Sequence, residues 1–578
     1  MANQLFRKKN IGTILREAEQ GLTDSHGTHE GLKRVLRVKD LTFFGIAAVI
    51  GTGVFTAIGS ASFHGGPGVV LLFILTAIAC GFAAYCYAEF ASTVPVSGSA
   101  YTYSYVAFGE IFAWIIGWDL LMEYAIGNIA VAISWSQYFV RVLAGFGIHI
   151  PEWMTMDYFT AHSGYTEVVK TMNTGVASGT IDTALQYAYN AWMKAPSIGN
   201  FKLIMNIPAF LIVGVISYIV YIGIKESKKA NNIMVMVKLA VILLVIVAGA
   251  FYVSPSNWHP FMPNGFSGVM SGVSAVFFAY IGFDAISTTA EECENPQHDL
   301  PKAMFNTLII CTVLYCILVL VLTGMTNYTK LNVADPLAFV FQDQHSKATN
   351  WISGIISVSA IIVIASVLLV YQLGQPRIWM SMSRDGLLPK IFSRIHPKYK
   401  TPSFSTILTG VVVAVPALFM NLDVVIALTS IGTLFAFVLV CGGVLVLQNQ
   451  PNKPQAKFKV PFISGKFIIP IFFILAVGII AAYAPEHFQN LFRREGIPMF
   501  IFWVVVAIVT VLSFINNFSL IPVMGLLSCF YLMAQESHTN WLRFAIWLVI
   551  GLCIYFTYGF KHSRLNAETI SGAGRPQG

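Results

Sequence analysis

Charged side chains are scarce in this chain. Asp, Glu, Lys and Arg together make up 11% of the 578 residues, while hydrophobic residues make up 56%. Soluble domains contain roughly 25% charged residues, so this composition excludes an ordinary soluble domain and predicts an integral membrane protein. The sequence also has no CxxC pair and no His/Cys cluster among its 8 cysteines. We therefore expect neither a disulfide framework nor a metal site.

A cleavable signal peptide is not expected, because residues 1–40 are polar and charged and lack the apolar core of such a peptide. We interpret them as a cytoplasmic N-terminal tail. Apolar segments follow, most of them near the ~20 residues that a helix needs to cross a bilayer. The 14 segments begin near Leu41, Val69, Phe108, Phe201, Ile233, Gly268, Ala303, Trp351, Phe404, Val424, Phe467, Pro498, Ile521 and Trp541. The thirteenth, at 521–534, is short, so we expect about 14 transmembrane helices, with 12 as the alternative.

Lysine and arginine are distributed unevenly between the segments that connect these helices. With the N-terminus inside, 25 of them lie on the inner side and 9 on the outer side, while Lys238 lies within a helix. The positive-inside rule therefore places both termini in the cytoplasm of a multi-pass protein of the plasma (inner) membrane. The net charge of +8 mostly reflects this asymmetry, so we do not interpret it as a nucleic-acid footprint.

Two apolar segments contain a glycine break near mid-membrane. The first, at about 41–63, contains Ile50-Gly51-Thr52-Gly53, and a later one contains Phe278-Ala279-Tyr280-Ile281-Gly282-Phe283-Asp284. Glycine costs helix stability, and in a bilayer every freed backbone group must find a partner within the protein. Interrupted helices at matching places in two halves of a membrane protein indicate a midplane substrate site. The alternative is that these glycines only allow helices to pack closely.

Several longer motifs occur in order along the chain. They are Ile50-Gly51-Thr52-Gly53-Val54-Phe55, the run 95–105, Glu291-Glu292-Cys293-Glu294-Asn295-Pro296, Gly374-Gln375-Pro376-Arg377, Arg384-Asp385-Gly386-Leu387-Leu388-Pro389 and Ser430-Ile431-Gly432-Thr433-Leu434-Phe435. By these motifs the chain resembles the amino acid–polyamine–organocation (APC) superfamily transporters, and within them the cationic amino acid transporter family. The resemblance covers about residues 35–563. It departs from the family pattern at His298, where arginine is usual, and in the added length at 145–200 and 467–514.

The resemblance implies an all-α integral membrane fold with a LeuT-like core of two inverted five-helix repeats. The first repeat would occupy residues 41–253 and the second 268–447. Four extra C-terminal helices would follow at 467–560, then a cytoplasmic tail at 561–578. Residues 145–200 form an extracytoplasmic insertion that is too long for an ordinary connection, and their mixed aromatic and polar content indicates a small folded cap or amphipathic helices.

The resemblance also implies a substrate site at the two breaks. The residues concerned are Ile50, Gly51, Thr52, Gly53, Phe278, Ala279, Ile281 and Gly282. Amides after the first break would bind the carboxylate of an amino acid, and carbonyls at both breaks would bind its ammonium group. The partial charges of half-helix ends favour the same arrangement for a zwitterion. Phe278 matches the aromatic gate of the family, and the alternative is an ordinary core aromatic.

Three ionisable residues within helices are candidates for proton coupling: Lys238, Glu123 and Asp284. A charge in the bilayer is expensive, so each indicates function by default. Lys238 matches the family lysine that takes the place of a sodium ion, with Ser366 as a candidate partner; the alternative is a side chain that snorkels to the inner interface. Asp119 lies one turn before Glu123. For the acids, the alternative is a structural ion pair or hydrogen bond.

These features together predict a secondary active transporter that imports amino acids by alternating access, coupled to protons and independent of sodium. The substrate could be cationic, and the partners are protons and membrane lipid, with no nucleic acid and no cofactor. The alternatives are a transporter-like amino acid sensor and an amino acid exchanger. An enzyme is not expected, because the sequence has none of the recognised nucleophile or metal signatures. A channel would need a carbonyl filter or a charge ring, which the sequence lacks.

Overall fold

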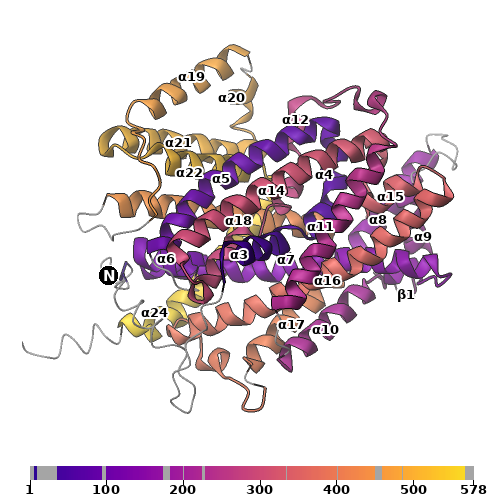
Figure 1. The fold of residues 1–578 in the computed structure, drawn as a ribbon, viewed down its shortest axis with the longest axis horizontal. Helices are drawn as coiled ribbons and strands as arrows, with labels where there is room; N and C mark the ends of the chain where they lie inside the picture. The colour runs from indigo at the N-terminus through magenta and orange to yellow at the C-terminus, as the bar shows by residue number, and fades with distance from the viewer. Residues whose placement is uncertain are drawn as a thin grey trace, which may run out of the picture.

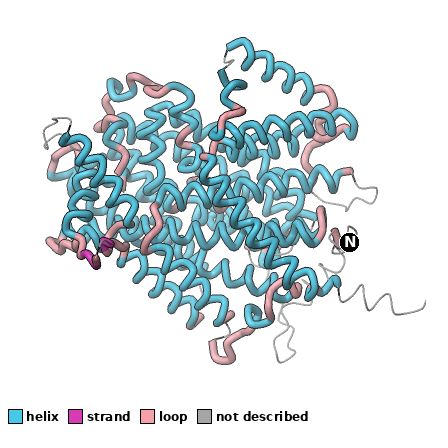
Figure 2. The backbone as a smooth tube through the Cα atoms, turned by 180° about the vertical axis from the view of Figure 1, so that it is seen from behind, coloured by secondary structure: helices cyan, strands magenta, loops and turns pink. Residues whose placement is uncertain are grey.

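The structure is a computed structural model that describes residues 6–8, 36–93, 99–173, 183–199, 201–223, 228–333, 335–399, 401–449, 458–483 and 486–566. Helices dominate this part of the chain, as Figure 2 shows in cyan. Among the described residues, the strands are one antiparallel pair, β1 (Ser197–Ile198) with β2 (Phe201–Lys202). The predicted all-α class is therefore confirmed.

Nine helical stretches in the described part of the chain are long and apolar enough to cross a membrane. Shorter apolar helices accompany them at Ile207–Tyr221, Ser403–Ala417, Ile468–Ala482 and Leu520–Ala534. This set fits the integral membrane protein that the composition predicts. The count of 14 and the inverted-repeat arrangement stay predictions.

The first apolar segment is an interrupted helix. Its two halves are α3 (Val38–Val49) and α4 (Ile58–Gly65), and a π-helical turn, η1 (Gly53–Ala57), leads into the second half. Ile50 closes α3 with an extended backbone, at φ −77° and ψ 95°. The elements that follow, as far as the second interrupted helix, are η2 (Gly66–Gly68), α5 (Val69–Thr93), α6 (Ser99–Ala107), α7 (Glu110–Gly145), η3 (Glu152–Met154), α8 (Tyr158–Asn173), α9 (Thr183–Lys194), β1, β2, α10 (Ile207–Tyr221), α11 (Lys228–Ala250) and η5 (Pro255–Trp258).

The second interrupted helix begins with α12 (Gly265–Met270) and α13 (Val273–Phe278). After the turn at 279–282, in which Gly282 has φ +115°, the chain continues as a 3₁₀ helix, η6 (Phe283–Glu292). The remaining elements are α14 (Pro296–Met325), η7 (Tyr328–Lys330), α15 (Pro336–Gln342), α16 (Lys347–Arg384), η8 (Lys390–Ser393), α17 (Ser403–Ala417), α18 (Leu422–Gln448), α19 (Ile468–Tyr483), α20 (Glu486–Asn490), η9 (Arg494–Gly496), α21 (Ile497–Asn516), α22 (Leu520–Ala534), α23 (His538–Ile554), η10 (Tyr555–Gly559) and α24 (Phe560–His562).

Long helices surround the two interrupted ones. Helix α7 packs along α16 and α18, α5 packs along α14, and α3 packs against α14 and η6. In Figure 1, α3 therefore lies near the centre of the bundle, while α19, α20, α21 and α22 stand at one side of it. The elements α8, α9 and β1 lie at the opposite end of the long axis from α24.

The insertion at 145–200 contains a small core of its own. Ala161, Ala191 and Ala195 are buried together with Ile204, which follows the insertion, and Trp192 is among the side chains that pack against them. Asn421 Nδ2, at the start of α18, donates to Thr160 Oγ1 over 2.8 Å and so ties α8 to the bundle.

The two helix breaks contact each other through their backbones. A Cβ added to Gly53 would lie 2.4 Å from Cα of Ala279, and one added to Gly282 would lie 2.9 Å from the carbonyl carbon of Ala48. Such distances leave no room for a side chain. These glycines therefore interrupt the helices and also let the two broken segments pack at backbone distance. The substrate site at the breaks stays a prediction.

We predict that Gly53→Ala destabilises the protein, because the new Cβ would overlap the backbone of Ala279. Overpacking of this kind costs ~1–3 kcal/mol. Gly81→Ala in α5 is the matched control, since a Cβ there meets nothing within 4 Å. An alanine in a helix interior should leave stability unchanged or slightly raised. Thermal unfolding of the purified proteins in detergent measures both, and equal midpoints for the two variants would contradict the packed contact.

Candidate functional site

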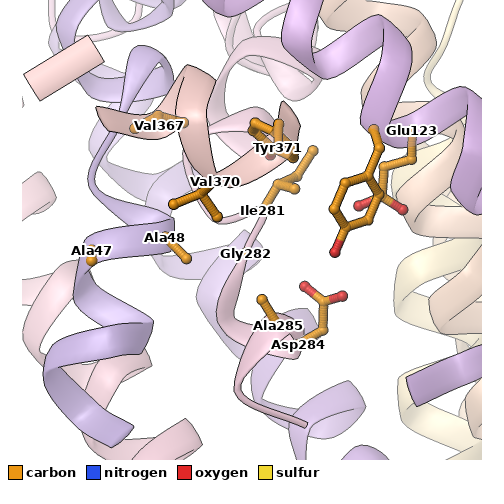
Figure 3. A pocket seen from close by; sticks show the side chains of 11 residues that line it. Ala47, Ala48, Glu123, Ile281, Gly282, Asp284, Ala285, Val367, Val370 and Tyr371 are labelled. Carbon is orange, nitrogen blue, oxygen red and sulfur yellow. The ribbon is translucent and has the colours of Figure 1, made fainter. Parts of the chain in front are cut away.

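A small cavity of about 30 Å³ lies beside the two breaks. Its walls come from α3, α7, α16, the turn after α13 and the start of η6. The residues that line it are Ala47, Ala48, Glu123, Tyr124, Ile281, Gly282, Asp284, Ala285, Val367, Val370 and Tyr371. Figure 3 shows Glu123 and Asp284 approaching the same space from different helices, opposite Val370. A space of this size holds a water molecule and is too small for an amino acid, so the cavity is nearly closed in this structure.

Lys238 of α11 is buried, with 2% of its surface exposed. Its Nζ donates a hydrogen bond to the carbonyl oxygen of Ala47 over 2.7 Å. The side chain therefore reaches into the bundle and does not snorkel to an interface, which was the alternative interpretation. Ser366, its candidate partner, is buried in α16 and donates to the carbonyl of Val363 in its own helix, at 2.7 Å.

The carbonyl groups at the end of α3 explain why a lysine is placed there. The last carbonyls of a helix have no partner within it, and a helix C-terminus carries partial negative charge. Lys238 binds the carbonyl of Ala47, and the hydroxyl of Tyr315 donates to that of Val49 over 3.2 Å. After the break, the hydroxyl of Tyr138 donates to the carbonyl of Phe55 over 2.6 Å. One cation and two tyrosines thus satisfy backbone groups that water cannot reach.

Glu123 of α7 and Asp284 of η6 are both buried and both line the cavity. Within the described part of the chain, Oε2 of Glu123 and Oδ1 of Asp284 have no hydrogen-bond partner. Both oxygens of Asp119, which does not line the cavity, also have no partner among the described residues, so a missing partner alone does not single out the cavity. Asp119 instead faces Gly432 of α18. A Cβ added to Gly432 would lie 3.1 Å from Oδ1 of Asp119.

The predicted substrate residues divide into two groups. Ile281 and Gly282 line the cavity, and Gly51 packs against Val367, which also lines it. The others are buried and are not among its lining residues: Ile50, Thr52, Gly53, Phe278 and Ala279. Two members of this second group, Gly53 and Ala279, pack against each other. In this structure the cavity therefore lies on the α3 and η6 side of the breaks, and substrate binding by these residues stays a prediction.

Several cavity residues were not identified from the sequence. Val367, Val370 and Tyr371 lie in α16, within the run 355–373, which contains neither glycine nor a charged residue to single them out. Tyr124 follows Glu123, and its ring meets that of Tyr371 edge to face with centroids 5.4 Å apart. In the sequence, only its position next to Glu123 indicated that Tyr124 could lie at the site.

Two protein-family models match the sequence of this chain. The family model described as "Amino acid permease" matches residues 36–509. A second model, described as "C-terminus of AA_permease", matches residues 519–563. The two matches include both helix breaks, Lys238, Glu123 and the four C-terminal helices α21 to α24 in whole or in part.

Curated relatives align along nearly the whole chain. The branched-chain amino acid permease BcaP of Bacillus subtilis (strain 168) is 39% identical over 98% of this chain and 100% of its own length. The methylthioribose transporter of the same organism is 38% identical over the same shares. The vacuolar cationic amino acid transporter 4 of Arabidopsis thaliana is 30% identical over 98% of this chain and 97% of its own length. The chain therefore belongs to the amino acid permease family of the amino acid–polyamine–organocation superfamily, and it is a transporter and not an enzyme.

Proposed function

We propose that this protein is a secondary active transporter that imports amino acids across the plasma (inner) membrane, coupled to protons and independent of sodium, by alternating access. The observation that carries the proposal is the bond from the buried Nζ of Lys238 to the carbonyl of Ala47. Ala47 is itself a wall of the cavity. A lysine side chain therefore lies next to the candidate site, and the family resemblance gives this lysine the place of a sodium ion.

The proposed coupling follows from the chemistry of the lysine. Protonated Lys238 makes a charge-assisted bond to a carbonyl that also feels the negative end of α3. The neutral amine loses the charge and with it most of the attraction, so α3 and α11 are held together more weakly. A proton gained outside and lost inside would then favour different arrangements of α3 in turn. A bound species shifts such an equilibrium only by its different interaction with the two states.

We predict that Lys238→Met abolishes accumulation driven by an inward proton gradient, because it keeps the length of the side chain and removes its charge. The measurement is amino acid uptake into proteoliposomes in sodium-free buffer, with and without the gradient. Lys302→Met, at the exposed start of α14, is the matched control and should accumulate substrate like wild type. If Lys238→Met also accumulates like wild type, the proton is carried by Glu123 or Asp284 instead. A sodium requirement in wild type would contradict the proposed sodium independence.

The acids of the cavity support a cationic side chain on the substrate. Glu123 and Asp284 each present an oxygen without a partner, and uncompensated buried charge is strongly destabilising. A guanidinium or ammonium group supplies several donors to such oxygens. The names of the cationic amino acid transporters among the relatives agree with this proposal, while the name of BcaP agrees with the apolar wall formed by Val367, Val370 and Ile281.

We predict that arginine and lysine compete for uptake better than leucine, isoleucine and valine. Glu123→Gln keeps the shape of the side chain and removes its charge, so it should raise KM for arginine by about tenfold or more, since hydrogen bonds to charged groups are worth ~1.5–3 kcal/mol. Its effect on leucine should be within about twofold. Competition by the branched-chain amino acids alone, with arginine inert, would contradict the cationic assignment and leave amino acid import intact.

The orientation proposed here places both termini in the cytoplasm and the insertion outside. The excess of lysine and arginine on the inner connections supports it. The positions of α8 and α9 at the opposite end of the bundle from α24 support it as well.

We predict that the insertion is dispensable for transport, because it packs in a small separate core and none of its described residues lines the cavity. Replacing residues 145–200 by a short linker should leave KM for uptake within a few fold of wild type. The variant must first be shown to be monodisperse and folded. Loss of binding in such a folded variant would show that the insertion closes the site. Binding without uptake in the wild type would favour a sensor, and uptake that needs a counter-substrate would favour an exchanger.

A further inference from the structure

A buried carboxyl group lies in the turn between α22 and α23, outside the helices that cross the membrane. Glu536 is 5% exposed. Its Oε1 makes a short hydrogen bond with the hydroxyl of Ser274, and its Oε2 accepts from Nδ2 of Asn540 over 3.3 Å. Ser274 belongs to α13, far away in the sequence. The turn therefore joins the C-terminal helices to one half of the second interrupted helix.

Ser274 connects three parts of the molecule. Its hydroxyl meets Glu536, and its carbonyl accepts from Oγ of Ser430 in α18 over 2.9 Å. It also precedes Phe278 by one helical turn, so the two side chains share a face of α13. Phe278 is the last residue of α13 before the break. Ser274 therefore lies on the half-helix that ends at the break.

The carboxyl group has few charges around it. Helices α13 and α22 contain no charged residue, and α18 contains only Asp423, in its first turn. Helix α23 contains His538 and Arg543, and Arg543 reaches Oδ1 of Asn540 over 3.0 Å and does not pair with the carboxyl group directly. The nearby η9 contains Arg494 and Glu495, both exposed. A hydrogen bond, and not an ion pair, is thus the main contact of Glu536.

We propose that Glu536 is a positioning residue for transport: through Ser274 it holds α13 against α18, and so sets the position of the helix break at Phe278 from outside the substrate site. This inference rests on the transport function proposed above. In the orientation proposed there, the turn and the start of α13 face the outside. It also assigns a role to the C-terminal helices, which contribute none of the residues that line the cavity.

The protonation state of Glu536 changes what it can offer. The protonated carboxyl group can donate to Ser274 and accept from Asn540, whereas the carboxylate can only accept. Burial raises the pKa of Glu536 from its ordinary 4.5 to about 7, although the bonds from Ser274 and Asn540 oppose the rise. The folded protein therefore binds this proton more tightly than the unfolded chain. The resulting stability is complete below pH 4.5 and is lost as the pH rises to about 7.

Three variants and one control test the proposal. Glu536→Gln keeps a donor for Ser274 and an acceptor for Asn540, and so imitates the protonated form. Glu536→Ala and Ser274→Ala each remove the contact from one side, and Ser274→Ala deletes a single oxygen atom, so it should still fold. Glu495→Gln, on the exposed η9, removes an acid from the same side of the molecule and should behave as wild type.

The measurement is KM for amino acid uptake at external pH values from about 5.5 to 8.5, with the thermal midpoint of each purified variant. We expect Glu536→Ala and Ser274→Ala each to raise KM by about five- to tenfold, and the double variant to raise it no further, because both remove one hydrogen bond. Glu536→Gln should keep the low-pH KM of wild type at every pH. The thermal midpoint of wild type should fall as the pH rises to about 7, in part because Glu536 ionises. Glu536→Gln should not show that part of the fall.

Unchanged KM in Glu536→Ala and Ser274→Ala, or effects that add in the double variant, would overturn the inference. So would a Glu536→Gln variant whose KM equals that of Glu536→Ala at all pH values. Wild-type uptake is measured first, because its absence would contradict the transport function itself. Normal wild-type uptake with unaffected variants contradicts only the role of Glu536.

Discussion

The structure depends on the contact between two interrupted helices at backbone distance. Gly53 meets Ala279 and Gly282 meets Ala48 with no side chain between them. A bilayer offers no water to the backbone groups that an interruption frees, so the interruption is stable only where protein groups replace water. Packing the two breaks on each other removes the lipid, and the glycines make that packing possible. The cavity beside the breaks and the elements that surround it follow from this one arrangement.

The carbonyl groups freed at the end of α3 are satisfied by groups of different chemistry. Tyr315 binds the carbonyl of Val49 with a hydroxyl that is neutral at any physiological pH. Lys238 binds the carbonyl of Ala47 with a group that can gain or lose a charge. The bonds to the carbonyls of Ala47 and Val49 thus differ in whether a change of protonation alters their strength. A conformational change linked to protons would act through the bond that responds, which is why we propose coupling at this lysine.

The sequence predicted the parts of this molecule that leave a local signal. Composition predicted the membrane class, glycines predicted both breaks, and isolated charges in apolar runs predicted Lys238, Glu123 and Asp284 as buried side chains. Val367 and Tyr371 could not be found, because an apolar residue that faces a cavity looks the same in sequence as one that faces lipid. The separation of Gly53 and Ala279 from the cavity could not be found either, since it depends on how far two helices approach. Periodicity and spacing carry no information on such distances.

Glu536 illustrates the same limit for polar residues. It lies between two apolar helices, where an acid normally faces water and needs no explanation. Only the fold shows that the turn folds inward and that its carboxyl group meets Ser274, 262 residues earlier in the chain. The contact unites two features that the sequence presents as separate, a broken helix at the site and a set of C-terminal helices away from it. Helices that line no part of the cavity can still determine where its walls stand, because a half-helix freed by a break is held only by its side contacts.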